Sequence, residues 1–268
     1  MKPSTQILIA AITMACLSVT KGAVSTTLFS DNFSDVDASK VPLSTGLNAD
    51  NWYFVGQVGG TPWTTGEDSV SPLSGTVLEN QGSSSGWQYA ARQFPAMTLS
   101  KTGDSLTVKL DYHVKSTDAD GGGGHLDVAL LNTSGSIENN SFTDEESDPL
   151  LNAKGYSAYQ FCKSTPTENT FVKIKNGADP FPAPKTTLRT SNSSPSVLGD
   201  SNEAHTLIFS LVKGESGIEM TWTVDGTVVG SASDMDSPYD VFNTLRLMAP
   251  SGTQAHLDNI SVVANIAK

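Results

Sequence analysis

Apolar and polar residues alternate along the segment Ser105–Leu131, SLTVKLDYHVKSTDADGGGGHLDVALL. The apolar positions are Leu106, Val108, Leu110, Tyr112 and Val114 in its first half, and Leu126, Val128 and Leu130 in its second half. A period of two is typical of a β-strand with one buried face. Four consecutive glycines lie between the halves, so the segment predicts two antiparallel strands joined by a glycine-rich loop.

The register of this predicted hairpin would also gather titratable side chains. If Tyr112 pairs with Leu126, both apolar rows face the core. His113 then lies opposite His125, and Asp111 lies opposite Asp127. A slip of one residue would destroy both patterns together, so the pairing is a sharp prediction.

Three interpretations of these four polar residues remain open. They can form a solvated sheet face, because polar residues alternate outward on many antiparallel sheets. They can form a surface that binds sugars or transfers a proton, because carboxylates accept hydrogen bonds from hydroxyls and imidazole titrates near neutral pH. They can also bind a transition metal, provided that four side chains on a flat pair of strands converge on one point.

Short patterns of the same kind recur along the rest of the chain, separated by turn residues. They lie at Thr27–Phe33, Asn51–Val58, Val77–Asn80, Trp87–Phe94, Tyr156–Lys163, Thr170–Ile174, His205–Val212, Ile218–Val224, Thr227–Ser231, Thr244–Met248 and His256–Val263. Prolines in Gly177–Pro195 exclude a central strand there, and Asp225-Gly226 indicates a tight hairpin turn. The pattern predicts an all-β fold, a sandwich of two antiparallel sheets.

The first 23 residues have the pattern of a secretory signal peptide. Lys2 supplies a positive charge, and the apolar run Ile7–Val19 is too short to span a membrane comfortably. We therefore expect residues 24–268 to form a single β-sandwich domain that is secreted or lies at the cell surface. No other segment is long and apolar enough to span a membrane.

The charge of the chain limits its partners. The formal net charge is −12, and cleavage after residue 23 would remove Lys2 and Lys21 and leave −14. Nucleic acids and anionic lipids would be repelled by such a protein. Cleavage would also leave Cys162 as the only cysteine, so we expect no intrachain disulfide.

Three aromatic residues, Trp63, Trp87 and Tyr89, are candidates for stacking against sugar rings. Trp63 stands in a loop rich in proline and glycine, where a large aromatic side chain is unusual unless it has a binding or packing role. The alternative is that these rings fill the core or one end of the sandwich.

Asp31 and Asp258 are candidate ligands of a structural calcium ion. They come from loops near the two ends of the chain, which would meet if the terminal strands are neighbours. Carboxylate oxygens suit calcium. The alternative is that both residues only form turns.

The segments HTLIFSLVKGESGIEMTWTVDGTVVGSAS, FNTLRLMAPSGTQAHLDNISVVA and LFSDNF together resemble the concanavalin A-like (laminin G-like) jelly roll of secreted bacterial proteins. In that superfamily a hairpin ending in Asp-Gly precedes a terminal strand with Leu-Asp-Asn. The resemblance implies a lectin-like sandwich and a polysaccharide or glycan partner. It implies no catalysis, since the fold carries lectins, enzymes and adhesive modules.

Glycan binding is accordingly the function that the sequence favours, and two other classes stay open. One is a structural or adhesive surface protein. The other is a polysaccharide lyase or hydrolase, although the E-x-D-x-x-E strand of the glucanases and the characteristic strands of the alginate lyases are absent from the chain.

In a lyase, the base would be His113 or His125 and the acid Tyr159, and Arg92 or Arg246 would hold the substrate carboxylate. A hydrolase would use Asp111 and Asp127. Directly opposed β carbons lie only about 5 Å apart, so these carboxylates would crowd below the spacing that a retaining enzyme needs. The lyase is therefore the better of the two enzymatic interpretations.

Overall fold

Sixteen β-strands run through the part of the chain that the computed structural model describes: residues 22–33, 46–47, 52–56, 63–68, 73, 75–80, 87–116, 125–135, 150, 152–161, 167–175, 185–194, 203–250 and 253–268. These residues contain no helix, and hence none long and apolar enough to cross a membrane. The prediction of an all-β fold is confirmed.

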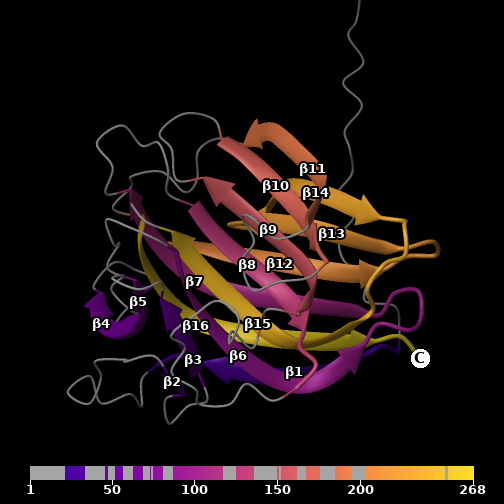
Figure 1. The fold of residues 1–268 in the computed structure, drawn as a ribbon, viewed down its shortest axis with the longest axis horizontal. Helices are drawn as coiled ribbons and strands as arrows, with labels where there is room; N and C mark the ends of the chain where they lie inside the picture. The colour runs from indigo at the N-terminus through magenta and orange to yellow at the C-terminus, as the bar shows by residue number, and fades with distance from the viewer. Residues whose placement is uncertain are drawn as a thin grey trace, which may run out of the picture.

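The strands form two antiparallel sheets of eight strands each (Figure 1). Sheet A has the order β14 (Thr227–Asp234), β13 (Ile218–Val224), β12 (His205–Lys213), β7 (Ser105–Ser116), β16 (Thr253–Ile266), β5 (Gly75–Asn80) and β4 (Thr64–Asp68), and β1 (Val24–Asp31) also pairs with β16. Sheet B has the order β11 (Lys185–Ser194), β10 (Thr167–Ile174), β9 (Lys154–Phe161), β8 (His125–Asn132), β15 (Val241–Pro250), β6 (Trp87–Thr98), β3 (Trp52–Gly56) and β2 (Gly46–Leu47).

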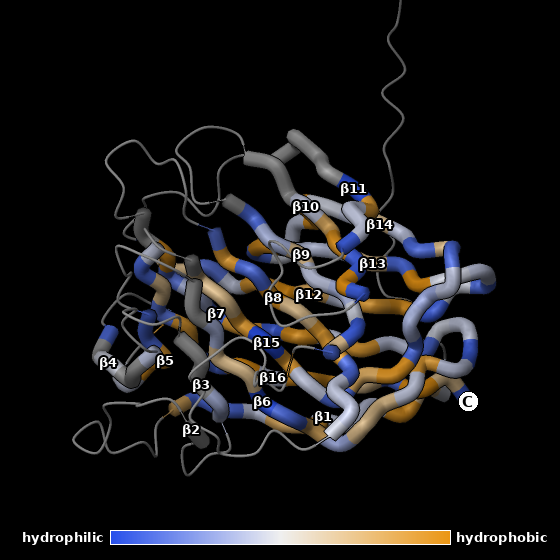
Figure 2. Tube along the Cα trace, in the orientation of Figure 1, coloured by the Kyte–Doolittle hydropathy of each residue, from blue (hydrophilic) through white to orange (hydrophobic). Residues whose placement is uncertain are grey.

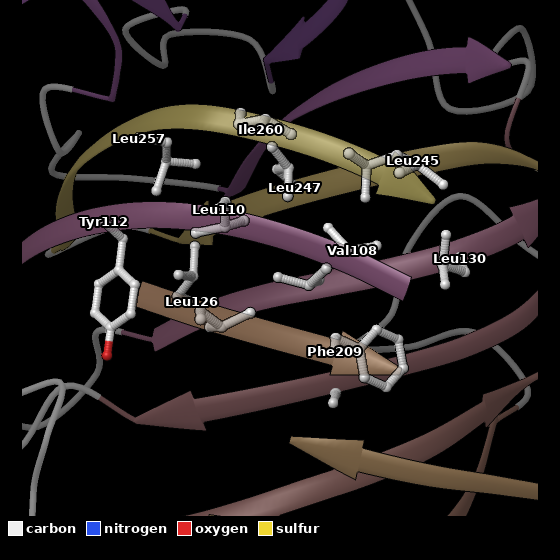
Figure 3. Close-up of a cluster of buried hydrophobic side chains, with 14 of the residues drawn as sticks. Val108, Leu110, Tyr112, Leu126, Leu130, Phe209, Leu245, Leu247, Leu257 and Ile260 are labelled. Atoms are coloured by element: carbon white, nitrogen blue, oxygen red, sulfur yellow. The ribbon is translucent and has the colours of Figure 1, made fainter. Parts of the chain in front are cut away.

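Alternate residues of both sheets meet in one hydrophobic core. Figure 3 shows Val108 and Leu110 of β7 with Leu126 of β8 and Leu247 of β15, all fully buried. The alternation of apolar and polar residues is visible along the strands in Figure 2. The period of two thus predicts correctly which side chains of β7 and β8 face the core, because successive residues of a strand point to opposite faces.

The predicted pairing of β7 with β8 is wrong. β7 lies in sheet A between β12 and β16, whereas β8 lies in sheet B between β9 and β15. The eight residues between these strands can span about 26 Å, and stacked sheets lie about 10 Å apart, so the chain can cross from one sheet to the other. As a consequence, His113 does not face His125, and Asp111 does not face Asp127.

Other local predictions are confirmed. The edge position of β11 agrees with the prolines that exclude a central strand near it. Asp225 and Gly226 join β13 to β14, and their φ angles of 48° and 78° are those of a tight hairpin turn with two left-handed residues. One local prediction is wrong, because strand β4 lies directly after Trp63, in a segment that the sequence predicts as a loop.

Candidate functional site

The outer face of sheet B, the face turned away from the core, carries a group of polar side chains that we call the sheet B network. Its centre is an ion pair between Arg246 of β15 and Asp127 of β8, with 3.0 Å between Nη2 and Oδ1. Ser157 of β9 donates a hydrogen bond of 2.7 Å to the other oxygen of Asp127. The side chains of Asp127 and Arg246 have no exposed surface. Three neighbouring strands thus hold one carboxylate and one guanidinium in a fixed position.

Two further members of the sheet B network lie beside this pair. His125 of β8 and Tyr159 of β9 have ring centroids 5.3 Å apart, at an angle of 46°. Tyr159 pairs directly with Asp127 in the register of β8 and β9. His125 is buried, while Tyr159 is partly exposed. The structure therefore brings together four of the predicted site residues, Asp127, His125, Tyr159 and Arg246, through strand pairs that the sequence did not predict.

The predicted aromatic stacking residues are placed differently. Trp63 is fully buried in the main core, and Tyr89 is fully buried in a smaller apolar cluster on the outer face of sheet B with Tyr53 and Met248. No ring face of Trp63 or Tyr89 is therefore exposed to a sugar. The side chain of Trp87 lies outside the described residues.

Asp31 and Arg92, predicted as a calcium ligand and a substrate-binding residue, bind each other in the structure. The Asp31 carboxylate accepts hydrogen bonds of 2.7 Å from Arg92 Nη1 and from the indole N–H of Trp52, and a third of 2.9 Å from the backbone N–H of Phe33. Arg92 also stacks on Phe29, 4.6 Å from the ring centroid. This contact ties β1 of sheet A to β3 and β6 of sheet B. A calcium ion bound to Asp31, or a substrate carboxylate bound to Arg92, would have to replace the ion pair between these two side chains.

Asp258 and Asp111 are direct partners in the pairing of β16 with β7, on the outer face of sheet A. Asp111 accepts hydrogen bonds from Thr206 Oγ1 and Asn259 Nδ2, at 2.6 and 2.9 Å. Burial raises the pKa of Asp258, and the charges of Asp111 and Asp31 add to this effect. The predicted proximity of Asp31 and Asp258 is consistent with this electrostatic contact.

A second cluster lies on the outer face of sheet A, and we call it the histidine cluster. His113 of β7 pairs with His256 of β16 in the strand register, and both Nδ1 atoms bind Asp68 Oδ2 of β4, at 3.0 and 2.5 Å. Glu79 of β5 lies 3.4 Å from His256 Nε2. Among the described residues, Asp68, His113 and His256 are the one group whose geometry could hold a metal ion.

Several of these residues were missed at the sequence level. His256 had a usable signal, since it stands two positions before Asp258 and therefore shares its face of β16. Asp68 had no such signal in the sequence, because its segment has the composition of a loop. Ser157 is one of many serines in the chain, and only its position opposite Ala129 of β8, beside Asp127, distinguishes it.

Comparison with known proteins gives the fold. Neither a protein-family model nor a curated protein matches the sequence. Among solved structures, the chain resembles the potassium-bound carbohydrate recognition domain of Emp46p, with 11% identity, a TM-score of 0.52, and coverage of 88% of this chain and 95% of that domain.

Two further similar structures are an endo-1,3-β-glucanase from Streptomyces sioyaensis and the carbohydrate-binding module CBM66 from Bacillus subtilis. The glucanase has 15% identity and a TM-score of 0.48, covering 90% of this chain and 96% of the glucanase chain. The module has 18% identity and a TM-score of 0.40, covering 78% of this chain and 93% of the module. With identities this low, the likeness concerns the fold. The two antiparallel sheets and the match to the Emp46p domain make this chain a concanavalin A-like jelly-roll sandwich.

Proposed function

We propose that the protein binds glycans on the outer face of sheet B, at the sheet B network. The observation that carries the proposal is the buried Asp127–Arg246 ion pair, held at 3.0 Å on a face that is not part of the main core. A buried ion pair adds little net stability compared with apolar side chains of the same volume. Its presence there favours a role in recognition, because carboxylates, guanidinium groups and phenols bind sugar hydroxyls.

Tyr159 is the point at which a ligand would meet the network. It is partly exposed, whereas Asp127, Ser157 and Arg246 are fully buried. Its ring supplies both an apolar face and a hydroxyl group, which suits a pyranose ring with its C–H and O–H groups. The fold, shared with a carbohydrate recognition domain, supports the same proposal.

Binding to immobilised neutral and acidic polysaccharides, or to a glycan array, tests this proposal. We expect Tyr159→Phe to weaken binding about tenfold, the value of one hydrogen bond of about 1.4 kcal/mol. Tyr239→Phe is the matched control, because Tyr239 is also partly exposed but packs on Tyr156, away from the network. Equal loss in both variants would contradict the proposed site. No binding by the wild type to any glycan would instead favour a structural or adhesive surface protein.

A second candidate function is that of a polysaccharide lyase, favoured by one observation. His125 and Tyr159, with ring centroids 5.3 Å apart, form a potential base and acid beside Arg246. Of the residues considered for this reaction, His113 and Arg92 lie elsewhere. A hydrolase that uses Asp111 and Asp127 is excluded by geometry, since these carboxylates lie on the outer faces of different sheets.

The lyase proposal is tested by incubating the protein with a panel of uronate polysaccharides and following the absorbance of the unsaturated product. His125→Ala and Tyr159→Phe should then each reduce the rate by about 100-fold or more. His113→Ala is the control, since His113 lies on sheet A, and it should retain the wild-type rate. Activity that survives in His125→Ala would refute this assignment.

We also propose that the protein is secreted after cleavage near residue 23. The support is the sequence pattern of Lys2 and Ile7–Val19, which lies outside the described residues. Expression of the full chain in a bacterium, followed by N-terminal sequencing of the extracellular protein, tests it. An uncleaved protein retained in the cell would contradict it.

A further inference from the structure

We infer that the histidine cluster binds a divalent transition metal ion of the zinc class. This inference goes beyond the glycan-binding proposal and does not depend on it, because the two sites lie on outer faces of different sheets. Asp68, His113 and His256 can each offer one ligand atom, and these three atoms lie within 4.8 Å of one another.

The spacing of the ligand atoms fits zinc. Two ligands on a tetrahedral zinc ion, with bonds of about 2.0–2.1 Å, lie about 3.3 Å apart. The distance from His113 Nδ1 to Asp68 Oδ2 is 3.0 Å, close to this value, while that from His256 Nδ1 to the same oxygen is 2.5 Å and would open by less than 1 Å. The two imidazole rings are nearly perpendicular, at 86°, and the Nδ1 atoms of both contact the same Asp68 oxygen.

The donor set selects among metals. Two imidazole nitrogens and a carboxylate oxygen suit zinc, copper or nickel, whereas calcium and magnesium prefer oxygen ligands alone. Glu79 Oε1 lies 3.4 Å from His256 Nε2, the ring nitrogen that would not bind the metal. Metal-bound histidines are commonly oriented by a carboxylate at this second nitrogen. The predicted metal therefore differs from the calcium ion that Asp31 and Asp258 suggest.

The charges around the cluster also favour a cation. The carboxylates of Asp68 and Glu79 both contact His256, at Nδ1 and at Nε2, so two acidic side chains lie close together. The side chains of His113 and Asp68 are only 3% and 5% exposed, so water and salt screen these charges little. A bound cation would neutralise the charges that Asp68 and Glu79 carry.

The metal would connect the edge strand β4 with the inner strands β16 and β7 of sheet A. Asp68, Glu79, His256 and His113 come from β4, β5, β16 and β7, four successive strands of sheet A. A metal bound by them would fasten the β4–β5 hairpin at the sheet edge to the sheet centre. Metal binding should therefore stabilise the folded state, by an amount that follows from the affinity and the free metal concentration.

The test uses the full chain, stripped of metal with a chelator and titrated with ZnCl2 in a calorimeter, with CaCl2 in parallel. We expect one zinc ion per chain, and a rise in Tm of roughly 5–10 °C at a zinc concentration about 100 times Kd. His256→Gln and Asp68→Asn should each weaken zinc binding by about 100-fold or more, and Glu79→Gln by about tenfold. These three side chains are only partly buried, or at the edge of the sheet, so we expect the variants to fold.

His205→Gln is the matched control. His205 forms a similar pair with Asp225, with 2.7 Å between Nδ1 and Oδ2, but Asp225 lies in an exposed turn. Among the described residues, this pair belongs to no group of three potential metal ligands, so zinc binding should be unchanged in the variant. The absorption spectrum of bound Co2+ needs no variant, and it should show the intense d–d bands of a tetrahedral site. Absence of zinc binding, binding that His256→Gln leaves intact, or preference for calcium would each overturn the inference.

Discussion

Removal of either partner of the buried Asp127–Arg246 pair should destabilise the protein much more than removal of both. The side chains have no exposed surface, and their charged atoms lie 3.0 Å apart. A single change, Asp127→Asn or Arg246→Met, leaves the other charge buried and uncompensated, which typically costs about 3–5 kcal/mol. The double variant removes both charges together. It should therefore cost less than either single change, which makes it more stable than the sum of the single effects predicts by at least about 3–5 kcal/mol.

The assay is urea unfolding of the four proteins in this double-mutant cycle, followed by tryptophan fluorescence. The pair His205–Asp225 provides a comparison, since the side chain of Asp225 is 50% exposed. Its coupling energy should be at most about 1 kcal/mol, because water screens the interaction. Additive effects at Asp127 and Arg246, within about 0.5 kcal/mol, would refute the view that these two side chains act as one unit.

Three further predictions concern stability. Burial alone would raise the pKa of Asp104, but hydrogen bonds from three backbone N–H groups outweigh it and hold this pKa below its usual value. The ionised Asp104 carboxylate should therefore contribute fully to the free energy of unfolding above pH about 4, and this contribution should disappear as the pH falls through the lowered pKa. Urea unfolding at several pH values should show that the free energy of unfolding depends less on acid pH in Asp104→Asn than in the wild type. Tyr156→Phe should cost about 1–3 kcal/mol, because the Tyr156 hydroxyl donates a buried hydrogen bond of 2.7 Å to Asp234, and a change below 0.5 kcal/mol would contradict this. Gly155→Ala should lower Tm strongly, because its Cβ would lie 2.1 Å from a backbone oxygen of β8, whereas Gly135→Ala meets no atom within 4 Å and should leave Tm nearly unchanged.

The sequence by itself determined which side chains of each strand face the core. Leu106, Val108 and Leu110 alternate with polar residues, and all three are buried as expected. The reason is local, since side chains point to opposite faces of a strand whatever the strand pairs with. The turn at Asp225-Gly226 was predictable for the same reason, because its left-handed φ angles depend on the two residues themselves.

Only the tertiary structure decided which polar residues meet. A period of two is the same for any partner strand, so it could not show that β7 pairs with β16 and β12 rather than with β8. His113 therefore meets His256, 143 positions later in the chain, while His125 lies in the other sheet beside Tyr159. Strand choice depends on how the strands of both sheets fill one core together, and that is a property of the whole sandwich rather than of any segment.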